Sequence, residues 1–96
     1  LTKAAVTAHV VSREVDVKAT LAKITLGEAD AAIVYHSDVV AAGSKVEGVE
    51  IPAAQNTTLA YPLVRLTDTA ATKAFADLLA SAAGLKELEA VGFLAP

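Results

Sequence analysis

The segment from Glu14 to Asp38 constrains the fold more than any other part of this 96-residue chain, because it combines two different apolar patterns. In its first half, Val17, Leu21 and Ile24 recur at helical spacing, as on one face of an amphipathic helix. Asp16 precedes that run, and a short carboxylate in this position accepts hydrogen bonds from first-turn amides. We therefore expect a helix of about two to three turns that begins near Val17.

The second half of the segment is an unbroken apolar run, residues 31–34, that leads into Tyr35. Such a run is typical of a parallel strand covered on both faces, so the expected fold class is α/β. Ligands in open α/β sheets bind outside the carboxyl ends of the strands, and helix N-termini offer amides to anions. The backbone amide of Val17 and the hydroxyl of Tyr35 are therefore candidate ligands of one anion site. On the residues alone, a tyrosine in this place is more often a packed ring, and Val17 a core residue.

The remainder of the chain predicts more strands and three more helices. Strand-like runs occupy residues 8–11, 45–51 and 58–66, and Pro62 confines the last of them to a sheet edge or to a crossing between sheets. The first expected helix is a short turn capped by Ser37 and Asp38 and ended by Gly43. The second is capped by Asp68 or Thr69 and has an apolar stripe from Ala71 to Leu79. The third runs from Ser81 to about Val91 and is ended by Gly92.

The composition excludes several classes of function. With 8 Lys and Arg against 11 Asp and Glu, the formal net charge of −3 gives no basic footprint for nucleic acid. Two Phe, two Tyr and no Trp leave little for stacking on bases. No apolar run approaches the ~18 residues of a membrane helix. The absence of cysteine excludes disulfides, thiolate metal sites and a cysteine nucleophile.

The sequence supports neither catalysis nor a metal site. His9 and His36 are the only histidines, and no carboxylate cluster shares a metal-like spacing with either. Glu28, Asp30 and Asp38 stand at expected turns and caps, where carboxylates are ordinary. No serine has the G-x-S-x-G setting of a nucleophile. We expect no enzyme activity, no cofactor and no free metal cation.

Several motifs together carry a resemblance to a known family. The string from Asp16 to Gly43, DVKATLAKITLGEADAAIVYHSDVVAAG, is followed by VEIP, by YPLVRL and by a helix pair that ends in GFLAP. This combination resembles the C-terminal part of the molybdate-binding proteins of bacterial ABC transporters. The resemblance implies a two-lobed type 2 periplasmic-binding-protein fold, in which an oxyanion is held in the cleft between the lobes by neutral hydrogen-bond donors.

The resemblance also implies a ligand set and a domain organisation. In the family, a backbone N–H at the start of a helix and the hydroxyl of the tyrosine in the I-V-Y motif are ligands of the oxyanion, and they correspond to Val17 and Tyr35. The family's other ligands, two serines and a further backbone amide, correspond to positions upstream of Leu1. Residues 1–58 correspond to part of lobe two, 59–66 to a hinge-crossing strand, and 67–96 to a C-terminal helix pair of lobe one. The start at Leu1 and the lack of methionine fit a piece of a longer protein, which we expect to pair with the N-terminal part of that protein or with a second copy of itself.

The function that the resemblance implies is capture of molybdate or tungstate outside the cytoplasm and delivery to an ABC permease in the membrane. The expected location is periplasmic or extracellular, with an N-terminal segment before Leu1 as the place for any membrane anchor. The alternative is a ligand-sensing effector domain of the same fold in a transcription regulator. A signal peptide upstream of Leu1 favours the importer, and a helix-turn-helix there favours the regulator.

Overall fold

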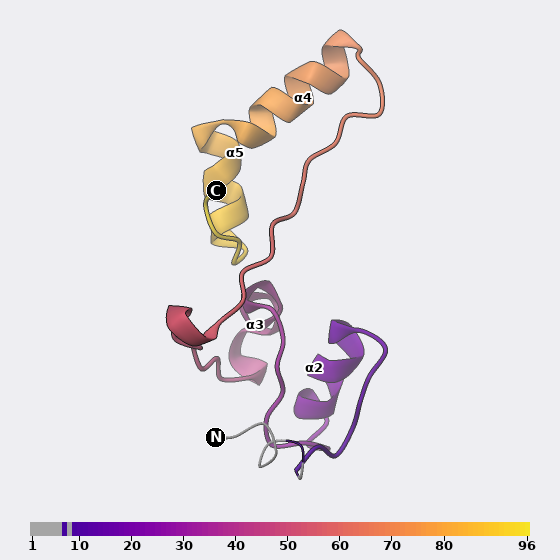
Figure 1. Ribbon diagram of the computed structural model, residues 1–96, viewed down its shortest axis with the longest axis vertical. Helices are drawn as coiled ribbons and strands as arrows, with labels where there is room; N and C mark the ends of the chain where they lie inside the picture. The colour runs from indigo at the N-terminus through magenta and orange to yellow at the C-terminus, as the bar shows by residue number, and fades with distance from the viewer. Residues whose placement is uncertain (1–6, 8) are drawn as a thin grey trace. The chain divides into compact units, whose positions relative to one another are not determined.

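The computed structural model describes Thr7 and residues 9–96. The chain divides into two compact units, Leu1–Glu47 and Gly48–Pro96, and each is described by itself. In chain order, the elements are α2 (Val17–Thr25), α3 (His36–Ala42), the 3₁₀ turns η1 (Gly43–Lys45) and η2 (Ala53–Gln55), α4 (Ala70–Ala80) and α5 (Ala82–Ala90) (Figure 1).

Helix α2 begins where the sequence predicts it. The Oδ1 atom of Asp16 accepts a hydrogen bond from the Ala19 amide at 2.7 Å, so the predicted cap is confirmed. The helix ends at Thr25, and Gly27 then takes a φ of +72° that residues with a side chain rarely adopt. That conformation lets the Glu28 amide reach back to the Lys23 carbonyl at 2.8 Å, which closes the last turn.

The predicted strands are not present. Residues 9–11, 31–35, 45–51 and 58–66 carry no strand in the described part of the chain, and residue 8 of the first run lies outside it. A strand exists only when its backbone N–H and C=O groups pair with a neighbouring strand. Apolar runs alone indicate which segments are suited to a sheet, and residues 9–96 do not supply the paired strands.

The expected burial of these runs is also wrong. No large hydrophobic side chain is buried among the residues that the structure describes, and Ile33, in the middle of the run expected to be covered on both faces, is 80% exposed. Burial of an apolar strand needs a layer of structure on each face. The helices of the unit Leu1–Glu47 do not provide those layers.

Helix α3 starts earlier than predicted and ends where predicted. Its N-cap is Tyr35, with extended backbone angles (φ −77°, ψ 153°), and not Ser37 or Asp38. Asp38 acts from inside the first turn, because its carboxylate accepts a hydrogen bond from the Tyr35 amide at 3.0 Å. The helix ends at Ala42, and Gly43 follows with a φ of +58°.

In the unit Gly48–Pro96, α4 and α5 form a helical corner with one residue between them. Thr69 caps α4, since its hydroxyl accepts from the Thr72 amide at 3.2 Å. Ser81 serves both helices: its Oγ donates to the Leu78 carbonyl at 2.6 Å and accepts from the Gly84 amide at 3.3 Å. The predicted restart at Ser81 is therefore confirmed.

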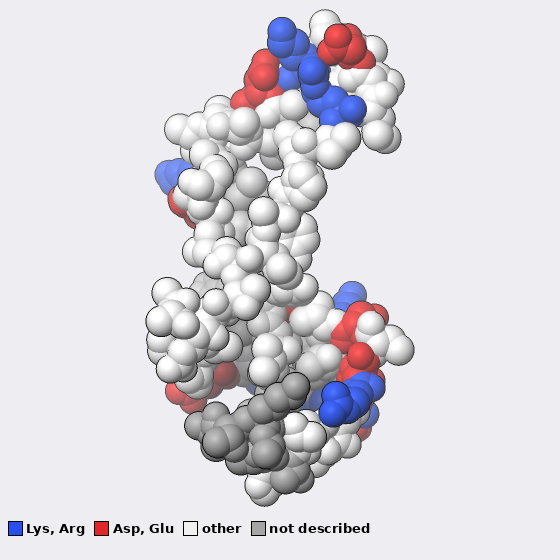
Figure 2. Space-filling view, viewed as in Figure 1, with Lys and Arg blue, Asp and Glu red and all other residues white. Residues whose placement is uncertain are grey.

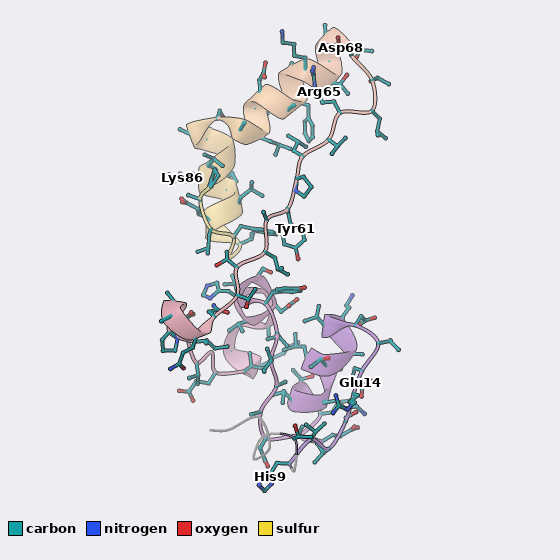
Figure 3. The ribbon with its side chains drawn as sticks, in the orientation of Figure 1. His9, Glu14, Tyr61, Arg65, Asp68 and Lys86 are labelled. Carbon is teal, nitrogen blue, oxygen red and sulfur yellow. The ribbon has the colours of Figure 1, made fainter. Side chains whose placement is uncertain are left out.

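The C-terminal tail folds back onto the same unit. Gly92 has a φ of +95°, and the Phe93 amide donates to the Leu88 carbonyl at 3.1 Å. The Phe93 ring then meets the Tyr61 ring edge to face, with 6.0 Å between centroids and 82° between planes. This contact ties the extended segment around Tyr61 to the end of α5 (Figures 1 and 3).

Candidate anion-binding site

Val17 is the first residue of α2 and is half-buried. The Asp16 carboxylate takes the Ala19 amide, and the Asp16 carbonyl takes the Thr20 amide at 3.1 Å. No acceptor is recorded for the amides of Val17 or Lys18 among the described residues. These two amides, at the positive end of the helix dipole, are donors that an oxyanion can use.

Tyr35 is the N-cap of α3, and the residue is 45% exposed. The Asp38 carboxylate holds the Tyr35 amide, and the Asp38 amide donates back to the Tyr35 carbonyl at 3.0 Å. The backbone that carries the phenol is thus fixed at two points. Tyr35 and Val17 belong to one compact unit, and each stands at the start of a helix. Their convergence on one ligand stays a prediction.

Lys23, in the last turn of α2, lies close to two carboxylates. The Nζ of Lys23 lies 2.5 Å from the Glu28 carboxylate and 3.9 Å from that of Glu14. The hydrogen bond that Lys23 donates to Glu28, with the negative charges of Glu28 and Glu14, raises the pKa of the Lys23 ammonium above the ordinary 10.5. Lys23, in the last turn of α2, therefore offers little free positive charge to an anion.

A hollow of about 300 Å³ lies at the other end of α2. It is lined by His9, Val11 and the turn from Gly27 to Ala31 (His9 is labelled in Figure 3). The negative end of the helix dipole lies here, together with the carboxylates of Glu28 and Asp30, and both disfavour an anion. No group of three His, Cys, Asp or Glu residues suited to a metal ion occurs among the described residues. The hollow is therefore separate from the predicted site.

Sequence reasoning missed the Lys23–Glu28 pair, which is the shortest ion pair recorded in the described part of the chain. The two residues are five positions apart, outside the i, i+3 and i, i+4 spacings of a continuous helix. The signal for it was Gly27, since a glycine after a helix lets the chain reverse and bring Glu28 back over the last turn.

Comparison with known proteins identifies the family. The model of the family described as bacterial extracellular solute-binding protein matches residues 2–94. The chain belongs to this family. Membership indicates a role in binding rather than catalysis, and it supports the α/β type 2 fold class and a place outside the cytoplasm. The two-lobed arrangement stays a prediction.

Three curated relatives share 34% identity with the chain over 89 residues. They carry the name molybdate-binding protein ModA and come from Mycobacterium bovis and from the CDC 1551 and H37Rv strains of Mycobacterium tuberculosis. The matched part covers 90% of this chain and 34% of each relative, so the chain spans about a third of their length. No solved structure matches the chain. In the residues described, no helix has the length and apolar character needed to cross a membrane.

Proposed function

We propose that this chain is part of an extracytoplasmic solute-binding protein that captures molybdate, or the closely similar tungstate, for an ABC importer. The observation that carries the proposal is the 34% identity, over 90% of the chain, to relatives named molybdate-binding proteins. The family description, bacterial extracellular solute-binding protein, favours this role over an effector domain of a regulator. The ligand enters as an oxyanion, so no cofactor or bound cation is part of the proposal.

The local structure supports Val17 and Tyr35 as ligands. Among the residues that the structure describes, no acceptor is recorded for the Val17 amide at the positive end of α2, and the Tyr35 phenol stands at a backbone position fixed by Asp38. A doubly negative tetrahedral ion gains most from N–H and O–H donors, because charge-assisted hydrogen bonds contribute about 1.5–3 kcal/mol each. Neutral donors also avoid the desolvation cost of burying a lysine.

In the proposed whole protein, residues 1–58 belong to lobe two, 59–66 form the strand that crosses between lobes, and 67–96 belong to lobe one. The oxyanion is trapped when the lobes close, so its binding is coupled to domain closure and not to a chemical step. The loaded protein then docks on a membrane permease. The location is periplasmic or extracellular.

The test is calorimetric titration with molybdate of a chimera in which this chain replaces the matched third of the Mycobacterium tuberculosis relative. We expect binding, and we expect Tyr35→Phe to weaken it about ten-fold, since one charge-assisted hydrogen bond is lost. Tyr61→Phe is the matched control, which removes the other phenolic hydroxyl of the chain and should leave the isotherm unchanged.

Two outcomes contradict the proposal at different levels. A folded chimera that binds no molybdate contradicts the function. An isotherm that Tyr35→Phe leaves unchanged removes Tyr35 from the ligand set while the function stands. Parallel titration with sulfate shows whether the site selects the larger oxyanion.

A further inference from the structure

Helix α3 begins at a residue type that is not a usual N-cap. Ser, Thr, Asp and Asn favour that position because a short side chain can accept the first amides, and tyrosine is not one of them. Ser37, two residues further on, is such a residue. The sequence therefore favours a start at Ser37 locally, and yet the N-cap is Tyr35, with φ −77° and ψ 153°. Another interaction must stabilise the earlier start.

That interaction is supplied by Asp38, which is half-buried in the first turn of α3. Its Oδ2 accepts a hydrogen bond from the Tyr35 amide at 3.0 Å. The acceptor is a carboxylate, so this bond is charge-assisted and stronger than one between neutral groups. The Tyr35 carbonyl in turn accepts from the amides of Asp38 and Val39 at 3.0 Å and 3.3 Å. These two bonds belong to a helix that starts at Tyr35, and the carboxylate favours that start.

The same bonds determine how the Tyr35 side chain is directed. Backbone angles set the direction of the Cα–Cβ bond and limit the rotamers that follow. The phenolic O–H lies at the far end of the side chain, so a later helix start would displace it. A hydrogen bond weakens steeply as its angle falls toward about 120°, and a displaced hydroxyl would therefore lose much of its bond to a ligand.

The charged cluster beside α2 does little to attract an anion. Acidic and basic side chains adjoin one another there on the face that Figure 2 shows, and Lys23 lies close to Glu28 and Glu14. Little net positive charge from this cluster is left for a ligand. The placement of a neutral donor such as the Tyr35 hydroxyl is then more important for affinity.

We propose that Asp38 is a positioning residue of the oxyanion site: its carboxylate holds the start of α3 at Tyr35 and thereby places the Tyr35 hydroxyl for the ligand. The inference rests on the proposed function, with Tyr35 as a ligand. Asp38 acts as a hydrogen-bond acceptor and not through its charge, because a negative charge repels an anion. An uncharged acceptor in the same place should serve as well.

The test is calorimetric titration with molybdate of variants of the chimera described above. Asp38→Ala removes the acceptor and should weaken binding about five-fold, the effect of one lost helix cap. Asp38→Asn keeps a carbonyl oxygen as acceptor and should bind within about two-fold of the original chain. Ser37→Ala is the matched control. It removes the neighbouring side chain suited to cap a later start, and it should also stay within about two-fold.

A double variant separates positioning from general stability. In a Tyr35→Phe background the hydroxyl is absent, so nothing is left for Asp38 to place. Tyr35→Phe with Asp38→Ala should therefore bind within about two-fold of Tyr35→Phe alone, because the two effects are coupled. A merely structural contribution of Asp38 would instead weaken binding about five-fold in both backgrounds.

A measurement without ligand reports the helix start itself. His36 is the first residue of α3, and its Cα chemical shift, followed by NMR in the chimera, should be helical in the original chain and in Asp38→Asn. In Asp38→Ala the shift should move toward the value of an extended residue. This readout does not depend on molybdate.

Four results overturn the proposal: full affinity in Asp38→Ala, an equal loss in the two Tyr35 backgrounds, a helical His36 in Asp38→Ala, and a loss in Asp38→Asn as large as that in Asp38→Ala. Each of them leaves the binding of molybdate by the original chain in place. A chimera of the original chain that binds no molybdate contradicts the proposed function, and the role of Asp38 in the site with it.

Discussion

The two compact units of this chain are held together by different kinds of interaction. In Leu1–Glu47 the recorded ties are polar and charged: the Asp16 cap, the bond from the Tyr35 amide to Asp38, and the cluster of Lys23 with Glu28 and Glu14. In Gly48–Pro96 the polar caps are supplemented by close packing. Helix α5 packs against α4 at Gly84, and the Phe93 ring packs against the Tyr61 ring. The first unit should therefore respond to pH and charge, and the second to side-chain volume.

The largest expected effect is that of Gly84→Ala in the second unit. Gly84 is buried, and a Cβ there would lie 2.3 Å from the Leu78 carbonyl oxygen and 2.5 Å from that of Leu79. Neither backbone atom can move without opening the corner. We expect destabilisation of the α4–α5 pair by about 1–3 kcal/mol, despite the better helix propensity of alanine, measured by amide exchange in α5.

Gly27→Ala is the matched change in the first unit. Gly27 has open space around the position of a Cβ, and only its φ of +72° is unfavourable. We expect a cost of about 1 kcal/mol, smaller than that of Gly84→Ala. Equal costs for the two glycines would show that packing does not distinguish the units.

The next effect is that of Asp16→Ala, which removes the cap of α2. The Ala19 amide then loses its acceptor, and amide exchange in the first turns should report a loss of about 1 kcal/mol. Asp16→Asn keeps a good cap and should cost little. If Asn is as harmful as Ala, charge and not capping is the contribution of Asp16.

The smallest effect concerns the pH dependence of the first unit. Because the pKa of Lys23 is raised in the folded chain, mainly by its hydrogen bond to Glu28, the pair stabilises the fold below pH 10.5. That contribution is lost as the pH rises through the higher folded pKa. Glu28→Gln should bring the Lys23 pKa, followed by NMR, back toward 10.5. If Glu28→Gln leaves the Lys23 pKa unchanged, this pair is not a source of pH dependence in the first unit.

The sequence predicted the helices well and the strands badly, for one physical reason. Asp16, Thr69 and Ser81 cap through bonds to amides three residues away, so each helix start is encoded locally. The runs at 31–34 and 58–66 need partners distant in sequence or in another polypeptide. Their apolar pattern predicted strands, and that prediction was wrong, because no strand lies in the described part of the chain.

The candidate site was also predictable from the sequence only in part. The start of α2 at Val17 was predictable from Asp16 and the apolar spacing. The position of Tyr35 as the N-cap of α3 was not predictable, because the aromatic side chain gives no capping signal and the hydrogen bond that fixes the cap is donated by the Tyr35 amide to the Asp38 carboxylate. Convergence of the two groups on one ligand depends on tertiary packing between the segments that carry them, and local sequence patterns do not encode such packing.

Ser81 is the only residue between two helices, and its hydroxyl is engaged by both of them. Such a joint has no slack: an inserted residue would rotate α5 by about 100° about its axis, since a helix has 3.6 residues per turn. We therefore expect homologues and engineered variants to show no insertions or deletions at this junction. The uncharged stretch between η2 and Leu59 should tolerate them.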